Sequence, residues 1–154
     1  MVGTNWGARQ YRRAREIAWT GAATVALLCG TIGLIVASHP MLWIGMFSDD
    51  ENVARLGALY LHIVAPVYVC FGLGLGLFFV TQGVGRAVVA MNANAARMLA
   101  SAGGGLIAIY WFDLGVAGFF TAVAAGFCLY AAMLVHAVCS VKIPDAALQT
   151  ALNR

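Results

Sequence analysis

A run of 30 residues without Asp, Glu, Lys or Arg follows Arg55 and constrains the fold of this chain more than any other feature. At about 1.5 Å per residue, a helix over this run is long enough to cross the ~30 Å hydrocarbon core of a bilayer. Pro66 lies inside the run and cannot donate a backbone hydrogen bond to the carbonyl of His62, so a break is expected there. The glycines at alternate positions of residues 72–76 would let a neighbouring helix approach closely. We therefore predict a broken membrane helix over residues 55–84.

The composition extends this interpretation to the whole chain of 154 residues. Apolar residues make up 62% and charged residues 10%, whereas a soluble domain averages about 25% charged residues. The four cysteines lie in apolar runs without a C-x-x-C pair, which favours free thiols over a metal or redox site. The sequence has no catalytic triad, metal-ligand spacing or phosphate loop. We therefore expect a membrane protein that is not an enzyme, needs no cofactor or metal, and binds no nucleic acid.

Three further spans are expected from the same reasoning. Residues 17–37 carry a small residue at every fourth position, which predicts close helix packing, and His39-Pro40 ends this helix. The span over residues 88–112 contains Arg97, whose guanidinium we expect to reach back to the lipid headgroups. The last span covers residues 115–141. The sequence thus predicts an all-α integral membrane protein with four transmembrane helices.

The start of the broken span has the pattern of a capping box. Ser48 precedes Asp49 and Asp50, and Glu51 stands three residues after it. In this pattern the serine hydroxyl caps the new helix while the glutamate side chain bonds back to the serine amide. We therefore predict that Ser48 is the N-cap.

The cations predict how the chain lies in the membrane. Four spans place the loop of residues 1–16, the loop from Arg86 to Arg97 and the tail of residues 142–154 on one side, with eight of the nine Lys and Arg residues. Arg55 alone lies on the other side. Because cytoplasmic loops are rich in cations, we expect both ends in the cytoplasm and the protein in the plasma membrane. The first segment holds four such cations, which set topology or alternatively bind anionic lipid: Arg9, Arg12, Arg13 and Arg15.

Four short motifs, in this order along the chain, resemble those of the multidrug and toxic compound extrusion (MATE) family. They are Val2-Gly3-Thr4-Asn5-Trp6-Gly7-Ala8 with Arg13-Ala14, Phe47-Ser48-Asp49-Asp50 with Val53, Gln82-Gly83-Val84-Gly85 with Arg97, and Leu114-Gly115-Val116. The resemblance covers only the C-terminal portion of the second lobe of such a protein. It implies that the four helices are part of a twelve-helix transporter with two lobes. A first lobe or a second chain would then be the partner, together with membrane lipid.

The resemblance also implies a function, namely a cation-coupled antiporter that exports drugs, xenobiotics or metabolites. Its substrates would be small organic molecules, often cationic, and its coupling ion would be H⁺ or Na⁺. No Asp or Glu falls within a predicted span, so a coupling carboxylate would be contributed from outside this chain, or this copy does not couple. Two alternatives are a non-transporting membrane scaffold or truncated remnant, and a lipid-linked saccharide flippase of the same superfamily.

The candidate site residues lie on the broken span. His62 is the coupling candidate, because a free imidazole titrates near neutral pH and because Pro66 frees its carbonyl. Broken membrane helices often line a transport site, and ring faces attract organic cations. The candidates for lining a cavity are therefore Tyr68, Phe71, Phe78 and Gln82. The alternative for each is a structural role, in which His62 or Gln82 bonds a neighbouring helix and the aromatic side chains pack or face lipid.

Overall fold

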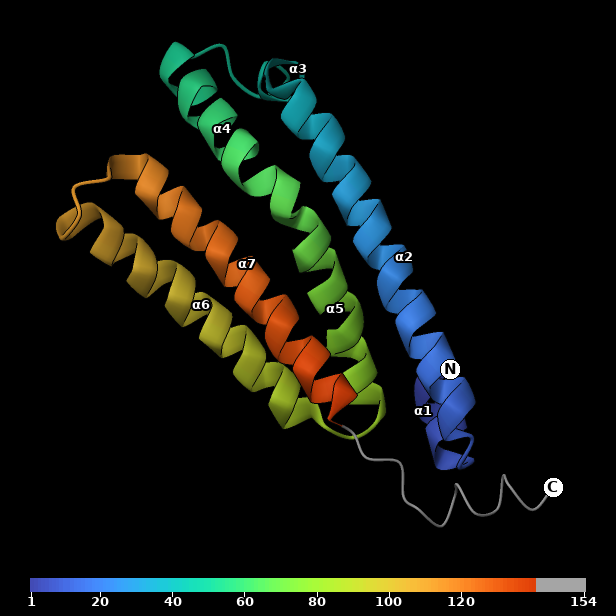
Figure 1. Ribbon diagram of the computed structural model, residues 1–154. Coiled ribbons are helices and arrows are strands. Elements are labelled where there is room, and N and C mark those ends of the chain that lie inside the picture. Colours follow the sequence, from blue (N-terminus) through green and yellow to red (C-terminus); the bar gives the residue numbers. More distant parts are fainter. Residues whose placement is uncertain (141–154) are drawn as a thin grey trace.

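The computed structural model describes residues 1–140, which form helices joined by short connections and contain no strand (Figure 1). The helices in chain order are α1 (Val2–Gly7), α2 (Tyr11–Ser38), α3 (Pro40–Ile44), α4 (Glu51–Val64), the 3₁₀ turn η1 (Ala65–Val67), α5 (Tyr68–Gly83), α6 (Ala87–Tyr110) and α7 (Gly115–Cys139). The expected tail and residue 141 lie outside the described residues.

Three segments of the described residues are long and apolar enough to cross a membrane. They are α2, the stretch Glu51–Gly83 that contains α4 and α5, and α7. α6 has 24 residues but is not among the three, because Asn92, Asn94 and Arg97 make its first half polar. Helix length and apolarity therefore establish three candidate spans, and not the expected four.

The N-terminal segment differs from the expected loop. Residues 1–16 contain all of α1, and α2 begins at Tyr11, six residues before the expected span. The edge of the Trp6 ring packs against Tyr11 with the ring centroids 4.8 Å apart. Arg12 Nε donates to Glu16 Oε1 at 3.2 Å, one helical turn further on. These contacts extend the helix into the Arg-rich segment.

The predicted capping box at the start of α4 is wrong. Asp50 is the N-cap, and its Oδ1 accepts the amide hydrogen of Asn52 at 2.7 Å. The Ser48 hydroxyl instead accepts from the amide of Asp50 at 3.2 Å. The helix thus begins at Glu51, two residues later than a Ser48 cap would set it, because an aspartate is as good a cap as a serine and stands directly before the first helical residue.

α2 and α5 pack through small residues, as the spacing along α2 predicts (Figure 1). The buried residues of α2 are all small: Ala14, Ala18, Ala22, Ala26, Gly30 and Gly33. On the facing side, a Cβ atom added to Gly76 would lie 2.7 Å from the Cα atom of Ala22. One added to Gly72 would lie 2.7 Å from the carbonyl oxygen of Val25. The two backbones are therefore in direct contact, which larger residues would prevent.

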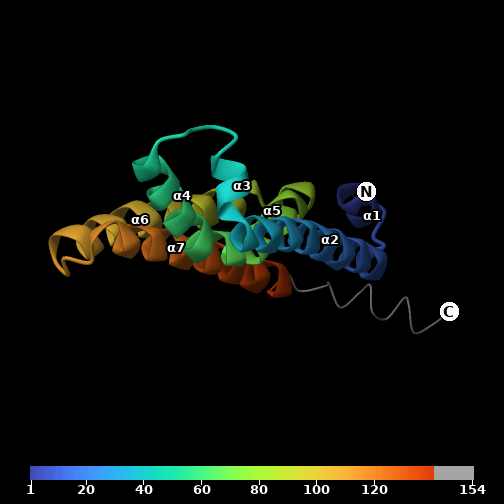
Figure 2. The same ribbon diagram turned by 90° about the horizontal axis from the view of Figure 1, so that it is seen from above.

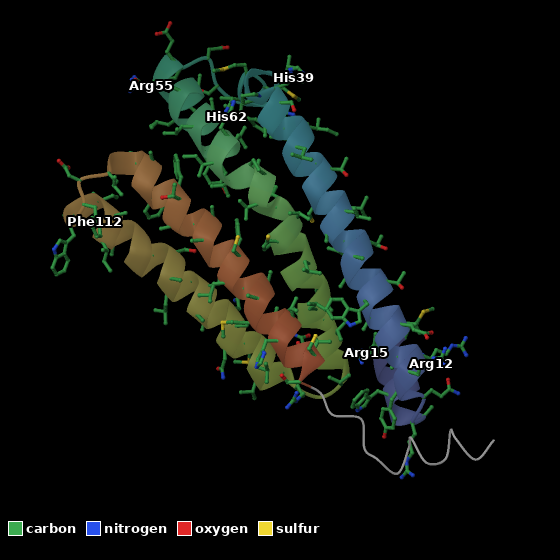
Figure 3. All side chains as sticks on the ribbon, in the orientation of Figure 1. Arg12, Arg15, His39, Arg55, His62 and Phe112 are labelled. Atoms are coloured by element: carbon green, nitrogen blue, oxygen red, sulfur yellow. The ribbon has the colours of Figure 1, made fainter. Side chains whose placement is uncertain are left out.

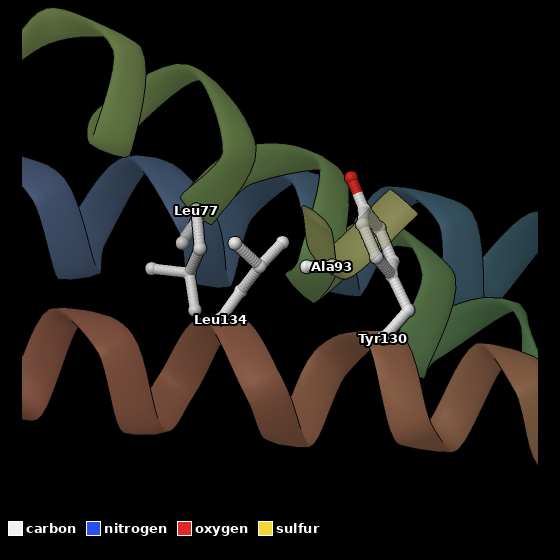
Figure 4. Close-up of a cluster of buried hydrophobic side chains, with 5 residues drawn as sticks. Leu77, Ala93, Tyr130 and Leu134 are labelled. Carbon is white, nitrogen blue, oxygen red and sulfur yellow. The ribbon is translucent and has the colours of Figure 1, made fainter. Parts of the chain in front are cut away.

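A cluster of buried side chains lies where α2, α5, α6 and α7 meet, and it includes Ala22 of α2. Leu77 and Leu134 are fully buried and face each other, and Ala93 and Tyr130 lie beside them (Figure 4). α1, the α5–α6 connection and the end of α7 lie at this end of the bundle (Figure 1). At the other end, the loop between α3 and α4 stands away from the helices (Figure 2). The helices therefore hold together at one end and carry the α3–α4 loop and the α6–α7 turn at the other.

Candidate functional site

The helix that contains Pro66 is interrupted there by η1. Val64, the last residue of α4, and Ala65, the first residue of η1, are both fully buried. Gly33 of α2 packs directly against this turn, since a Cβ atom added to it would clash with the carbonyl oxygen of Ala65. The break therefore packs against α2 through Ala65, while Pro66 itself is exposed.

An aromatic hollow of about 360 Å³ lies beside the break, between α2, α4, α5 and α7. Four of its six lining residues are aromatic: Cys29, Ile32, Tyr60, Tyr68, Phe71 and Phe127. The Phe127 ring packs at 5.0 Å between centroids against Phe71 and at 6.3 Å against Tyr68. Tyr68 and Phe71, two of the four cavity candidates, thus line one hollow together with Phe127 of α7, which the sequence does not single out. The hollow is large enough for a small organic molecule.

Phe78 and Gln82 lie elsewhere on α5. Phe78 packs against the buried cluster around Leu77, and its ring contacts Phe79 at 5.6 Å between centroids. Gln82 is exposed, one residue before the end of the helix. Neither side chain is among those that line the aromatic hollow.

His62 borders a different hollow from the aromatic one. Its side chain is exposed on α4, at the same end of the bundle as Arg55 (Figure 3). The two residues line a wide, open groove of about 610 Å³ between α4 and the start of α7. Nδ1 of His62 lies 2.8 Å from the carbonyl oxygen of Ala58. Because a carbonyl oxygen only accepts, Nδ1 carries the hydrogen in this contact and Nε2 stays available to a further partner.

The surroundings of Arg97 were not predicted from the sequence. Arg97 is the eleventh of the 24 residues of α6, and the expectation that its side chain reaches the lipid headgroups stays a prediction. The guanidinium carbon lies 5.4 Å from the ring centroid of Phe127, 5.7 Å from that of Tyr130 and 6.0 Å from that of Phe71. Nε donates to Oδ1 of Asn94 at 3.3 Å. The cation is thus surrounded by ring faces from α5 and α7, which attract it.

Close packing of α6 on α7 places Arg97 there. A Cβ atom added to Gly126 of α7 would lie 3.2 Å from the carbonyl oxygen of Arg97, and it would clash with Oγ of Ser101. At this separation of α6 from α7, the side chain of Arg97 lies along α7, beside the aromatic residues Phe127 and Tyr130. The motif resemblance marks Arg97, but the rings come from positions 71, 127 and 130, whose proximity no local pattern reveals.

The four topology arginines are all exposed near the N-terminus. Arg12 and Arg15 lie at the opposite end of the molecule from Arg55 and His62 (Figure 3). Arg15 also borders a small cavity of about 50 Å³ with Trp6, Tyr11 and residues of α5 and α7. Arg12 and Arg15 are therefore separated from Arg55 by the length of the bundle, as the charge pattern predicts.

Comparison with known proteins identifies the family. No curated protein and no solved structure matches the chain. The family described as MatE matches residues 1–107, which is well over half of the chain. This range includes α1, the small-residue face of α2, the broken helix and Arg97. The chain therefore belongs to the MatE family of membrane transporters.

Proposed function

We propose that this chain forms the closing part of the second lobe of a cation-coupled antiporter, which exports drugs, xenobiotics or metabolites across the plasma membrane. In this proposal α6 is a fourth span, and both ends of the chain lie in the cytoplasm. The other helices come from a first lobe or a second chain. Family membership and the partition of the cations between the two ends support it.

The observation that carries the proposal is the position of the aromatic hollow beside the break in the helix. Transporters place their substrate sites near the middle of the membrane, at helices interrupted by irregular backbone. Here η1 lies between α4 and α5, and Tyr68 and Phe71 directly after it line the hollow. A substrate held there would contact the segment in which α4 and α5 change direction relative to each other. Its binding and release would then be linked to the angle between those helices.

Coupling requires a group that binds H⁺ or Na⁺. No Asp or Glu of the sequence lies within the central part of a candidate span. His62 is the candidate on this chain, since Nδ1 donates to the carbonyl oxygen of Ala58 and Nε2 has no hydrogen-bond partner within residues 1–140. It lines an open groove with Arg55, between α4 and the start of α7. In this proposal a partner lobe supplies any carboxylate that takes part.

Transport in proteoliposomes by the chain assembled with the first lobe or second chain that completes the transporter tests the proposal. With an imposed proton or sodium gradient, we expect counter-transport of a fluorescent cationic dye such as ethidium. Phe71→Ala should lower the rate by about tenfold, because loss of one desolvated ring face costs about 1–2 kcal/mol. Phe79→Ala is the matched control, since Phe79 lies on the same helix with 63% of its surface exposed.

The outcomes separate the competing functions. An equal loss in the Phe71 and Phe79 variants would remove the hollow from the mechanism. No dye movement by the assembled transporter under either gradient would contradict the antiporter and favour a scaffold or remnant. Movement of a lipid-linked saccharide in place of the dye would favour a flippase. His62→Ala should flatten the dependence of the rate on pH, whereas His136→Ala, at the far end of α7, should leave it unchanged.

A further inference from the structure

We propose that Arg15, Trp6 and Tyr11 bind the phosphate of one anionic phospholipid. All three residues line the cavity of about 50 Å³ where α1, α2, α5 and α7 meet. This cavity is separate from the two hollows that the proposed transport function uses, so the lipid site does not depend on that function. It requires only that the chain lies in a membrane, as its family and its apolar helices indicate.

α1 and the start of α2 build the cavity. A Cβ atom added to Gly3 of α1 would lie 2.8 Å from the carbonyl oxygen of Gly83, so α1 packs directly on the end of α5. Trp6 of α1 in turn packs edge-on with Tyr11, at 4.8 Å between the ring centroids. Arg15 stands four residues after Tyr11 and therefore lies on the same side of α2. The three side chains thus border one space beside α5.

The polar side chains that line the cavity favour a ligand with acceptor atoms. The guanidinium of Arg15 and the indole of Trp6 only donate hydrogen bonds, and the hydroxyl of Tyr11 can donate one. The fourth polar lining residue, Thr81, already donates to a backbone carbonyl oxygen of its own helix. Arg15 is exposed and the two rings are half-buried, so a ligand can reach them. No carboxylate lines the cavity to compete for these donors.

The charge of Arg15 favours an anion. An arginine stays protonated in proteins. The one ion pair among residues 1–140 joins Arg12 to Glu16, and it leaves Arg15 without a carboxylate partner in this part of the chain. The planar fork of a guanidinium matches the oxygens of a phosphate and forms strong, charge-assisted hydrogen bonds with them.

The size of the cavity and its level in the membrane favour a lipid phosphate. The volume is several times the ~10–15 Å³ that one water needs, so a phosphate-sized group fits and a whole lipid does not. About 18 Å further along α2, the side chains of Leu27 and Leu28 are 68% and 59% exposed, as expected near the middle of the hydrocarbon core. Arg15 then lies at the level of the headgroups, where Trp and Tyr are also enriched. Acyl chains attached to the phosphate would extend from there along the apolar helices.

Quenching of Trp6 fluorescence by brominated lipid tests the site in the full chain. The three other tryptophans are changed to Phe, and the chain is placed in nanodiscs that contain brominated phosphatidylglycerol or brominated phosphatidylcholine. Phosphatidylcholine brings its own cation and would leave the charge of Arg15 unbalanced. We therefore expect phosphatidylglycerol to bind beside Trp6 about tenfold more tightly. Salt at ~1 M shortens the Debye length to about 3 Å and suppresses the diffuse attraction of exposed arginines.

Matched variants separate the cavity from the general charge of the segment. Arg15→Gln should abolish the preference for phosphatidylglycerol, whereas Arg15→Lys, which keeps the charge, should retain part of it. Arg13→Gln removes the same charge from an exposed side chain that does not line the cavity, and it should change the preference little. A chain that retains Trp111 alone, beside Phe112 at the other end of the bundle (Figure 3), should show no preference.

Equal quenching of Trp6 by the two lipids would overturn the proposal. Equal losses in the Arg15→Gln and Arg13→Gln variants would do the same, because diffuse charge attraction would then explain the preference. Displacement of phosphatidylglycerol by inorganic phosphate would assign the cavity to a water-soluble anion and would also contradict a lipid site. Far-ultraviolet circular dichroism should show the same helix content in every variant, because Arg15 and Arg13 are both exposed.

Discussion

The contact between α2 and α5 allows a quantitative test of the fold at Gly76. A Cβ atom at this position would lie 2.7 Å from the Cα atom of Ala22 and 3.1 Å from its Cβ atom. The first distance is 0.7 Å below the 3.4 Å at which ordinary van der Waals contact begins. Because the obstructing atom belongs to the backbone, no side-chain rotation can relieve the overlap. Gly76→Ala therefore forces the two helices apart.

The expected cost follows from a comparison with a second glycine. Overpacking a closely packed interface costs about 1–3 kcal/mol. Alanine is favoured over glycine in a helix by about 0.8–1.0 kcal/mol, which offsets part of that cost. Gly21 lies on α2 with no atom within 4 Å of an added Cβ, so Gly21→Ala gains the helix preference without the overlap. The difference in unfolding free energy between the two variants isolates the steric term, which we expect to be about 1–3 kcal/mol.

Unfolding of the full chain in mild detergent by added dodecyl sulfate, followed by far-ultraviolet circular dichroism, measures this difference. Gly21→Ala should be at least as stable as the unmodified chain, and Gly76→Ala should be less stable. Surface substitutions usually change the unfolding free energy by less than about 0.5 kcal/mol. If the unfolding free energies of the two variants agreed within this range, the steric reasoning would be refuted. The α2–α5 interface would then be looser than the structure has it.

Two further predictions use other contacts. Sγ of Cys70 on α5 and Sγ of Cys128 on α7 lie 3.9 Å apart, so copper-phenanthroline should oxidise the two thiols to an intramolecular disulfide. Mass spectrometry would then show two thiols protected from alkylation, and Cys128→Ser should abolish this protection. Unprotected thiols in the unmodified chain would contradict the packing of α5 on α7. Asp50→Ala should lower the unfolding free energy by about 1 kcal/mol through loss of the N-cap bond to Asn52, whereas Glu51→Gln should change it little. A larger loss for Glu51→Gln than for Asp50→Ala in the same detergent unfolding assay would favour the capping box of Ser48 and Glu51 instead.

The sequence alone determined the features that depend on composition and on short-range geometry. Whether a helix is long and apolar enough to cross a bilayer depends on its own residues, which is why three of the expected spans correspond to helices that meet this condition. The position of η1 follows from the missing amide hydrogen of Pro66. The small residues of α2 likewise mark its buried face, because residues at every fourth position of a helix lie on the same side of it.

The tertiary structure decided which side chains meet. The close packing of α6 on α7 at Gly126 brings the guanidinium of Arg97 to aromatic residues of α5 and α7. The same kind of distant contact brings Phe127 to Phe71 and leaves Phe78 and Gln82 away from the hollow. These outcomes depend on how the helices turn about their axes and how closely they pack. Both are set by residues on other helices, far away in the sequence, so no local pattern contains them.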